Sequence, residues 1–258
     1  MEIKRREALK ILGAGTLGLL SQGFVRPGKG KRHIITLSFD DGFEKSSIRT
    51  AEIYEKHGLS CCLNVIASAH LDQFQLPNEY HDWPVGDFTM WNDLKKRGHE
   101  IMPHSYKHTN LTEVPLEEAQ YWTRKCIDVF NEELEGFVAK ESVFSLPHNA
   151  STPELEDWLV TEFRAIRTHG GLYNPLPHEG MVRLGCGGFG PGNIDQHLVE
   201  SIDAFLEGPP GWLIYNTHGL DDEGWGPLSS GLLDELLDRL KGTDGVEVLP
   251  VIPALDSV

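Results

Sequence analysis

Two short clusters of carboxylates and imidazoles carry the side-chain types that hold a catalytic metal ion. Asp40 and Asp41 are adjacent, and His104 and His108 are four positions apart. A catalytic metal needs about three protein ligands and one open position for water, and imidazole nitrogen with carboxylate oxygen suits zinc. A helical turn or a tight loop would aim both imidazoles the same way. One aspartate would complete a three-ligand site and leave the other as a base.

Each cluster also has a purely structural explanation. In a chain with 12 histidines, a pair at this spacing can arise by chance on a solvated surface. Adjacent aspartates can end a strand or cap a helix by accepting hydrogen bonds from local backbone N–H groups. The segments that precede the two clusters help to decide between these explanations.

Both clusters follow segments with the pattern of strands. Residues 33–39 are rich in apolar and β-branched side chains and stop at Asp40, and residues 99–102 form a shorter candidate strand that runs into His104. Ligand sites in parallel α/β sheets form at the carboxyl ends of the strands. This placement favours a shared site.

The rest of the chain alternates between strand and helix patterns. Residues 72–89 lack periodicity and predict a surface excursion, and the Gly-rich residues 185–192 predict a loop. The predicted helices cover residues 44–57, 91–97, 115–134, 195–206 and 229–240, with a further one that Thr152 caps and Pro153 begins; the remaining predicted strands cover residues 59–67, 143–146, 163–167, 212–217 and 246–252. The alternation predicts a mostly parallel sheet, and 258 residues suit one catalytic domain.

Charge, apolar content and cysteine spacing limit the classes of partner that the protein can bind. A formal net charge of -16 argues against nucleic acid, whose affinity rests on Lys and Arg displacing counterions. The chain has no apolar run of the roughly 20 residues that a stable membrane span needs. Its four cysteines, at positions 61, 62, 126 and 186, have no CxxC spacing, so we expect them to be buried thiols rather than zinc ligands.

The N-terminal segment has the order of an export signal. Basic residues up to Lys10 precede a short apolar, Gly-rich run over residues 11–20 and then small residues. The pair Arg5 and Arg6 indicates the twin-arginine route. We therefore expect residues 1–27 to be a signal and linker, residues 28–258 to be the catalytic domain, and the protein to be periplasmic or extracellular. If the segment is instead a helix of the domain, the protein is cytoplasmic.

The two clusters also resemble known motifs. SFDDG at residues 38–42, followed by HSYKH at residues 104–108, resembles the first two motifs of the polysaccharide deacetylase family, which is carbohydrate esterase family four with its NodB-homology domain. The GHE run at residues 98–100 and the NTH run at residues 216–218 also resemble this family. The likeness therefore covers residues 33–252. It implies a single-domain α/β fold, a distorted (β/α) barrel of the TIM-like type.

The resemblance also implies roles for individual residues. It makes Asp41, His104 and His108 the ligands of one divalent metal, Zn²⁺ before Co²⁺ or Ni²⁺. Asp40 corresponds to the general base and His218 to the general acid. The implied reaction is removal of N- or O-acetyl groups from a carbohydrate by a metal-activated water. A capping or core role is the alternative for His218.

The third motif departs from the family pattern. The family has Arg-x-Pro-Tyr where this chain has SLPH at residues 145–148, so the arginine that would orient the base is missing. Arg164 or Arg167 can replace it in space, although we expect each to form a surface ion pair. The backbone N–H of His148 can still serve the oxyanion site. The acidic partner of the acid histidine, which belongs to the fourth motif, has no clear match.

Three alternatives stay open at the level of sequence. Trp225 can stack on a sugar face or be a packed loop residue. The altered third motif also admits a metal-dependent amidohydrolase acting on a small non-sugar amide or formamide. Loss of the arginine further admits a carbohydrate-binding protein that no longer turns over its ligand.

Overall fold

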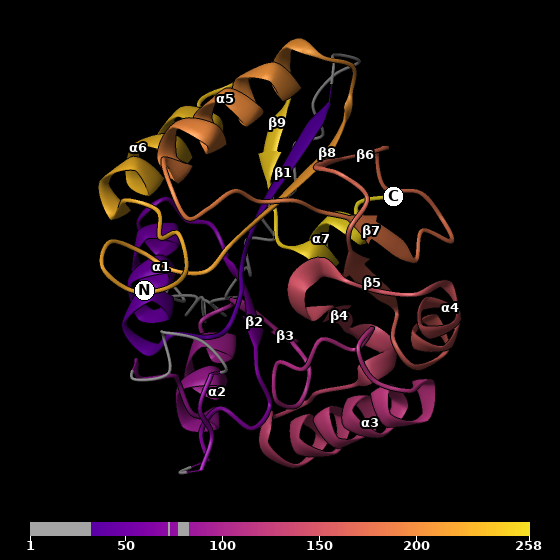
Figure 1. The fold of residues 1–258 in the computed structure, drawn as a ribbon. Helices are drawn as coiled ribbons and strands as arrows, with labels where there is room; N and C mark the ends of the chain where they lie inside the picture. Colours follow the sequence, from indigo (N-terminus) through magenta and orange to yellow (C-terminus); the bar gives the residue numbers. More distant parts are fainter. Residues whose placement is uncertain (1–31, 72, 77–82) are drawn as a thin grey trace, which may run out of the picture.

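The strands of the computed structural model form two curved sheets (Figure 1). The structure describes residues 32–71, 73–76 and 83–258. The first sheet contains β1 (His33–Phe39), β2 (Cys62–Val65), β3 (Glu100–Pro103), β6 (Tyr173–Asn174), β8 (Gly211–Thr217) and β9 (Val246–Val248), and the second contains β4 (Val143–Ser145), β5 (Ala165–Thr168) and β7 (Arg183–Gly185).

The two sheets together make a distorted barrel. The first sheet has the order β3-β2-β1-β8-β6, with β9 also paired to β1, and the second has the order β4-β5-β7. All of these pairs are parallel except β6 with β8. The sheets meet where β3 contacts β4, and again just after β7, where Gly187 forms a parallel bridge to Tyr215. The predicted single-domain α/β fold with mostly parallel strands is confirmed.

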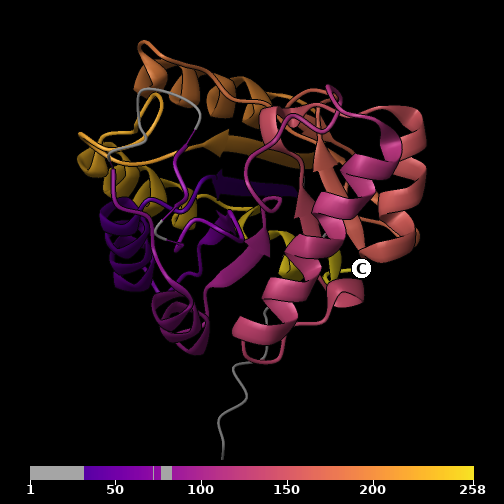
Figure 2. The ribbon, with the colours of Figure 1, turned by 60° about the horizontal axis from the view of Figure 1, so that its bottom comes forward.

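Helices cover the outside of the strands in both ribbon views. Helices α1, α2, α5 and α6 lie around one side, and α3 and α4 lie around the other (Figures 1 and 2). Their bounds are α1 (Glu44–Lys56), α2 (Phe88–Lys96), α3 (Leu116–Glu133), α4 (Pro153–Glu162), α5 (Ile194–Glu207), α6 (Ser230–Lys241) and α7 (Val251–Leu255). Every residue of β1 and β8 is buried, as expected for parallel strands with a packed interior on one face and helices on the other.

Local signals in the sequence account for several helix starts. Thr152 accepts a hydrogen bond from the Leu155 N–H, and Pro153 occupies the first turn of α4, as the sequence predicts. Asp87 caps α2 in the same way by accepting from the Met90 N–H. These caps satisfy backbone donors that have no partner inside the helix.

The predicted last strand over residues 246–252 is wrong in its second half. Strand β9 ends at Val248, and α7 begins after Pro250. Proline has no N–H to donate to a strand ladder. The first N–H groups of α7, from Val251 and Ile252, instead donate to the Glu100 carboxylate at 2.8 and 2.7 Å. A side chain from a distant strand thus selects helix over strand here.

Two further sequence expectations concern the cysteines and membranes. All four cysteines are buried free thiols, as predicted. Within the described ranges, no helix has the length and apolar character needed to cross a bilayer. The expected export signal over residues 1–27 lies outside the described residues.

Candidate active site

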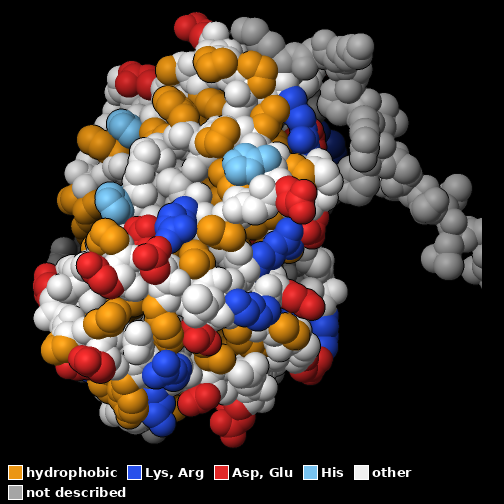
Figure 3. All heavy atoms as spheres, turned by 90° about the vertical axis from the view of Figure 1, so that its right-hand side faces the viewer, with side chains coloured by type: hydrophobic (Ala, Val, Ile, Leu, Met, Phe, Trp, Pro, Cys, Tyr) orange, Lys and Arg blue, Asp and Glu red, His pale blue; other side chains and the backbone are white. Residues whose placement is uncertain are grey.

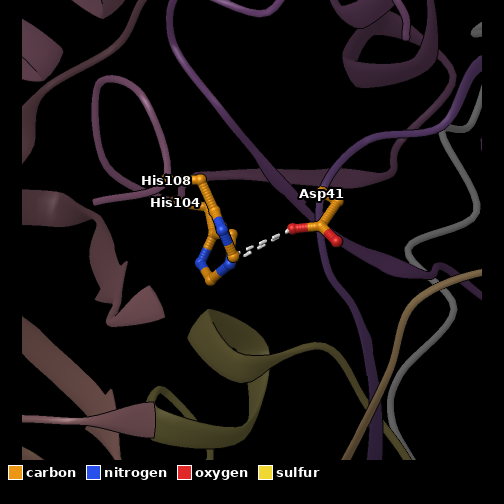
Figure 4. A group of neighbouring side chains, drawn as sticks. All are labelled: Asp41, His104 and His108. Atoms are coloured by element: carbon orange, nitrogen blue, oxygen red, sulfur yellow. Dashed lines mark ion pairs between the residues drawn. The ribbon is translucent and has the colours of Figure 1, made fainter. Parts of the chain in front are cut away.

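Asp41, His104 and His108 meet at the carboxyl ends of β1 and β3 (Figure 4). The Oδ1 atom of Asp41 lies 3.2 Å from His108 Nε2 and 3.6 Å from His104 Nε2. One ligand atom from each residue falls within 4.8 Å of the others, and all three side chains are buried. The structure therefore brings together the three residues proposed from sequence as metal ligands.

Unusual backbone conformations aim these side chains. Asp41, Ser105 and His108 have positive φ angles of 73°, 65° and 57°, a region that residues with a Cβ rarely occupy. The Ser105 hydroxyl accepts the His108 N–H at 3.0 Å and closes a tight turn. The two histidines are thus aligned by a loop, not by a helix. Of the six non-glycine residues with positive φ in the described ranges, these three, His148 and Asn149 line or adjoin the site.

The three side chains fit a divalent cation. Asp41 Oδ1 is buried and receives no hydrogen bond from any described residue. The His104 Nδ1 atom bonds to the Ser145 carbonyl at 2.8 Å, which leaves Nε2 directed at Asp41. Burial lowers the pKa of His104 to about 3 and that of His108 to about 4, so both imidazoles are neutral ligands near pH 7. A bare carboxylate beside two neutral imidazoles is a donor set that a cation completes.

Asp40 is held by a buried arginine. Arg167, at the end of β5, donates from Nη1 to Asp40 Oδ1 at 2.8 Å and from Nη2 to Oδ2 at 2.7 Å. Asn64 Nδ2 also donates to Oδ1, at 2.6 Å. Burial alone would raise the pKa of Asp40, but the Arg167 guanidinium outweighs it and holds that pKa well below its usual range. Asp40 is therefore an ionised carboxylate fixed in orientation.

The expected surface pairing is wrong for Arg167 and correct for Arg164. Arg167 is fully buried and reaches the site, whereas Arg164 pairs with Asp256 at 2.6 Å on the surface. Arg167 thus makes the contact to Asp40 that the missing arginine of the third motif would make. The sequence signal for it was an arginine at the end of an apolar strand, where a buried charge needs a partner.

A chain of buried polar side chains, not anticipated from sequence, connects Asp40 to His104. Asn64 Nδ2 donates to Ser38 Oγ at 2.7 Å, and Ser145 Oγ donates to Asn64 Oδ1 at 2.8 Å. The Ser145 carbonyl in turn holds His104. This network runs across β1, β2 and β4, so it fixes the spacing between the carboxylate and the imidazole.

His218 lies at the end of β8 and lines the same cavity as Asp40 and Asp41. Its ring makes an edge-on contact with Trp225, with ring centroids 5.2 Å apart. The Nδ1 atom has no hydrogen-bond partner among the described residues, so no carboxylate plays the part of the fourth motif there. Trp225 is partly buried and also lines the cavity, which makes it both a packing residue for His218 and part of the cavity wall.

The cavity has a volume of about 580 Å³, enough for a sugar unit with its acyl group. His148 lies on its wall in a left-handed conformation, with φ 58°, and its ring centroid is 4.7 Å from that of His108. The residues that complete the wall are Asn149, Gly188, Phe189, Gly190 and Asn216. The residues that the sequence proposed as metal ligands, base, acid, oxyanion donor and sugar contact therefore all border this one cavity.

Comparisons with known proteins agree with this architecture. No curated protein sequence matches the chain. Among solved structures, a protein from Mycobacterium smegmatis assigned as a polysaccharide deacetylase has a TM-score of 0.65 at 15% identity, with 90% of this chain and 93% of that chain covered. A family 4 acetyl xylan esterase from Clostridium thermocellum, with a cobalt ion, has a TM-score of 0.58 at 15% identity, with 86% and 90% covered. The peptidoglycan deacetylase PdaC from Bacillus subtilis has a TM-score of 0.55 at 14% identity, with 88% of this chain and 91% of that chain covered.

These likenesses show a shared fold, and the sequence itself shows the family. The polysaccharide deacetylase family model matches residues 28–176, more than half of the chain. The matched part includes β1, β2, β3 and β5, and with them the Asp41, His104 and His108 cluster and the Arg167–Asp40 pair. The protein is thus a hydrolase of amide or ester bonds in carbohydrates, and the chain belongs to the polysaccharide deacetylase family.

Proposed function

We propose that the protein removes acetyl groups, N- or O-linked, from a carbohydrate with the help of one divalent metal, most readily Zn²⁺, with Co²⁺ and Ni²⁺ as alternatives. The observation that carries the proposal is the division of labour between two adjacent aspartates. Asp41 Oδ1 is buried, receives no hydrogen bond from any described residue and faces two neutral imidazoles, whereas Asp40 is anchored by Arg167. The family's substrates make an acetylated carbohydrate the expected partner.

Asp41, His104 and His108 would hold the ion. When bound, such an ion lowers the pKa of water and polarises the acyl carbonyl. Asp40 accepts the proton of the attacking water through Oδ2, the oxygen that lies 3.9 Å from His104 Nε2 and so faces the ligand cluster. Arg167 and Asn64 fix the carboxylate because both donate to Oδ1 and Arg167 also donates to Oδ2.

Two other residues complete the reaction. His218 lines the cavity at the end of β8 and donates a proton to the leaving amine or alcohol. The backbone N–H of His148 stabilises the developing oxyanion. The left-handed backbone at His148 turns this peptide at the cavity wall, a conformation that costs about 1 kcal/mol or more and persists where function requires it.

The test is acetate release by the zinc-loaded, cobalt-loaded and nickel-loaded protein from N-acetylglucosamine oligomers and acetylated xylan. Asp40→Asn should abolish turnover and keep one metal ion per chain, because Asp40 is not a ligand. His104→Ala should lose both turnover and the bound metal ion. An Asp40→Asn variant that retains the rate of the parent would remove Asp40 from the base role.

Two other functions, a non-sugar amidohydrolase and a binding protein without turnover, rest on the missing arginine of the third motif. The bidentate contact of Arg167 to Asp40 supports the deacetylase over both. Formate and ammonia release, measured beside acetate, would reveal a small amide as the substrate. Sugar binding without any product would reveal a binding protein that no longer turns over its ligand.

We also propose that residues 1–27 are an export signal and linker, and that residues 28–258 form the mature catalytic domain. The order of basic, apolar and small residues supports the signal. An extracytoplasmic location would give the enzyme access to acetylated polymers outside the cell.

A further inference from the structure

One wall of the cavity carries an exposed aromatic ring that the reaction does not use. Phe189 is 43% exposed, and it is the one large hydrophobic residue with such exposure, within the described ranges, that lines the cavity. The others, including Tyr173 at 53%, do not border the cavity. An exposed ring at the mouth of a site is a candidate contact for ligand.

The Phe189 ring is held in place although it is exposed. It stacks on the His197 ring with centroids 4.4 Å apart and planes 11° from parallel. The His197 Nδ1 atom is hydrogen-bonded to the Tyr215 hydroxyl at 2.9 Å. Because His197 covers one face of the ring, the exposed area belongs to the opposite face and the edges. A rigid platform loses little freedom when a ligand binds to it.

The loop that carries Phe189 is tied to β8, the strand that ends just before His218. The Asn216 N–H donates to the Gly187 carbonyl at 2.9 Å. A Cβ on Gly188 would lie 2.3 Å from the Asn216 carbonyl oxygen, so only glycine lets the loop approach β8 this closely. Gly190 in turn packs against the Trp225 ring, where a Cβ would lie 3.2 Å away. Phe189 is thereby fixed relative to His218 and Trp225.

We propose that Phe189 is a substrate-binding residue whose free face stacks on the apolar C–H face of a pyranose ring, the unit next to the one that carries the acyl group. The inference rests on the proposed function and extends it, because it assigns the enzyme to sugar oligomers or polymers over single acetylated sugars. A flat ring that packs on its other side suits the flat, apolar face of a pyranose.

The experiment compares Phe189→Ala with Tyr173→Ala in the full chain. Tyr173 is a matched control because its ring is also exposed and stacked, on Phe205 at 5.5 Å and 16°, but lies away from the cavity. In the zinc-loaded Asp40→Asn background, Phe189→Ala should raise the Kd for the N-acetylglucosamine tetramer or an acetylated xylotetraose about tenfold by calorimetry. Tyr173→Ala should leave it within twofold, and Phe189→Trp should restore it.

Kinetics with an active base separate this role from a structural one. With Asp40 intact, Phe189→Ala should raise KM for the better oligomer about tenfold and leave kcat nearly unchanged, while KM for a single acetylated sugar stays that of the parent. Equal losses on the oligomer and the single sugar, or an unchanged Kd for the oligomer, would overturn the proposal.

The same measurements distinguish the two hypotheses. Oligomer hydrolysis that is indifferent to Phe189→Ala would leave the proposed function standing and remove the Phe189 platform. Oligomer binding that depends on Phe189 without any acetate release would remove the proposed function and keep the platform. Failure of both oligomers to bind would overturn both.

Discussion

Asp40 and Asp41 are neighbours in the chain, yet their surroundings push the two carboxyl groups in opposite directions. Asp40 receives two hydrogen bonds from Arg167 and its pKa lies well below the usual range. Burial raises the pKa of Asp41 to about 6, an effect that His218 partly offsets, and no described residue donates a hydrogen bond to its Oδ1. Opposed environments of this kind separate a carboxylate that stays ionised from one that takes up a proton just below neutral pH.

This contrast predicts the pH dependence of metal binding. Above pH 6 the Asp41 carboxyl of the metal-free protein is ionised, and below pH 6 it is protonated, so a cation must displace a proton to bind. Zinc affinity should fall about tenfold per pH unit below 6. Calorimetry of the apo-protein in two buffers should show uptake of about one proton by the buffer at pH 5. An affinity that does not change down to pH 5 would contradict the assignment of Asp41.

A second residue-scale prediction concerns Arg167. Arg167→Met should lower kcat about 100-fold, because the base loses its orientation. Burial would then raise the pKa of Asp40, so the acid limb of the pH–rate profile should move to higher pH, with activity lost as pH falls through the new value. Arg167→Lys should recover only part of the rate, since an ammonium cannot make the bidentate contact.

Arg164→Met is the matched control for that experiment. Arg164 sits three positions earlier and pairs with Asp256 at the surface, so its removal should change neither kcat nor the pH profile. Thermal unfolding of each variant shows whether it is folded. An unshifted acid limb in folded Arg167→Met would mean that the arginine does not tune the base.

At the residue scale, sequence predicted the members of the site better than their connections. Asp41, His104 and His108 could be placed together because each follows a strand and the carboxyl ends of parallel strands converge. The Arg167–Asp40 contact joins residues 127 positions apart and follows no known motif spacing in this chain. The Asn64 and Ser145 network was missed because buried polar side chains inside strands give no periodic signal.

At the scale of secondary structure, a single carboxylate decides that the chain forms helix α7 after β9. The Glu100 side chain accepts both leading N–H groups of α7, which no residue of α7 itself can satisfy. Apolar residues 246–252 look like one strand because the deciding contact comes from β3, about 150 positions earlier in the chain. Strands β6 and β7 were missed for a simpler reason, since two or three residues are too short for a pattern.

Glu100→Ala should therefore destabilise the protein by about 2 kcal/mol, since it leaves two donors of α7 without a partner. For a domain of this size that corresponds to a fall in Tm of roughly 4–8 °C. Glu100→Gln retains one acceptor oxygen and should lose about half as much. Scanning calorimetry of the three proteins tests the order, and equal Tm values for Ala and the parent would show that the carboxylate does not hold α7.

At the scale of the whole molecule, charge and location bear on the choice of substrate. The chain has 39 acidic and 23 basic residues, and on the face in Figure 3 the basic side chains are interspersed with acidic ones and form no continuous patch. Such a surface offers little long-range attraction to a polyanion. A neutral acetylated glycan outside the cell is consistent with this surface and with the proposed export signal.

The export proposal makes its own prediction. In a bacterial host with a twin-arginine pathway, the full chain should be recovered outside the cytoplasm with an N-terminus near residue 28. Replacing Arg5 and Arg6 by Lys should leave the uncleaved precursor in the cytoplasm. N-terminal sequencing and cell fractionation measure both, and unchanged export of the Lys variant would exclude the twin-arginine route while leaving a general signal peptide intact.

The left-handed backbone at Asp41, Ser105, His108, His148 and Asn149 has a consequence for how such a protein can change over evolutionary time. Glycine would relieve the strain of a positive φ at each of these positions, so a backbone under no catalytic demand would be free to lose the ligands and the turn at His148 and Asn149. Continued demand for catalysis opposes that drift. A descendant that became a mere sugar binder should accordingly show glycine at several of these sites.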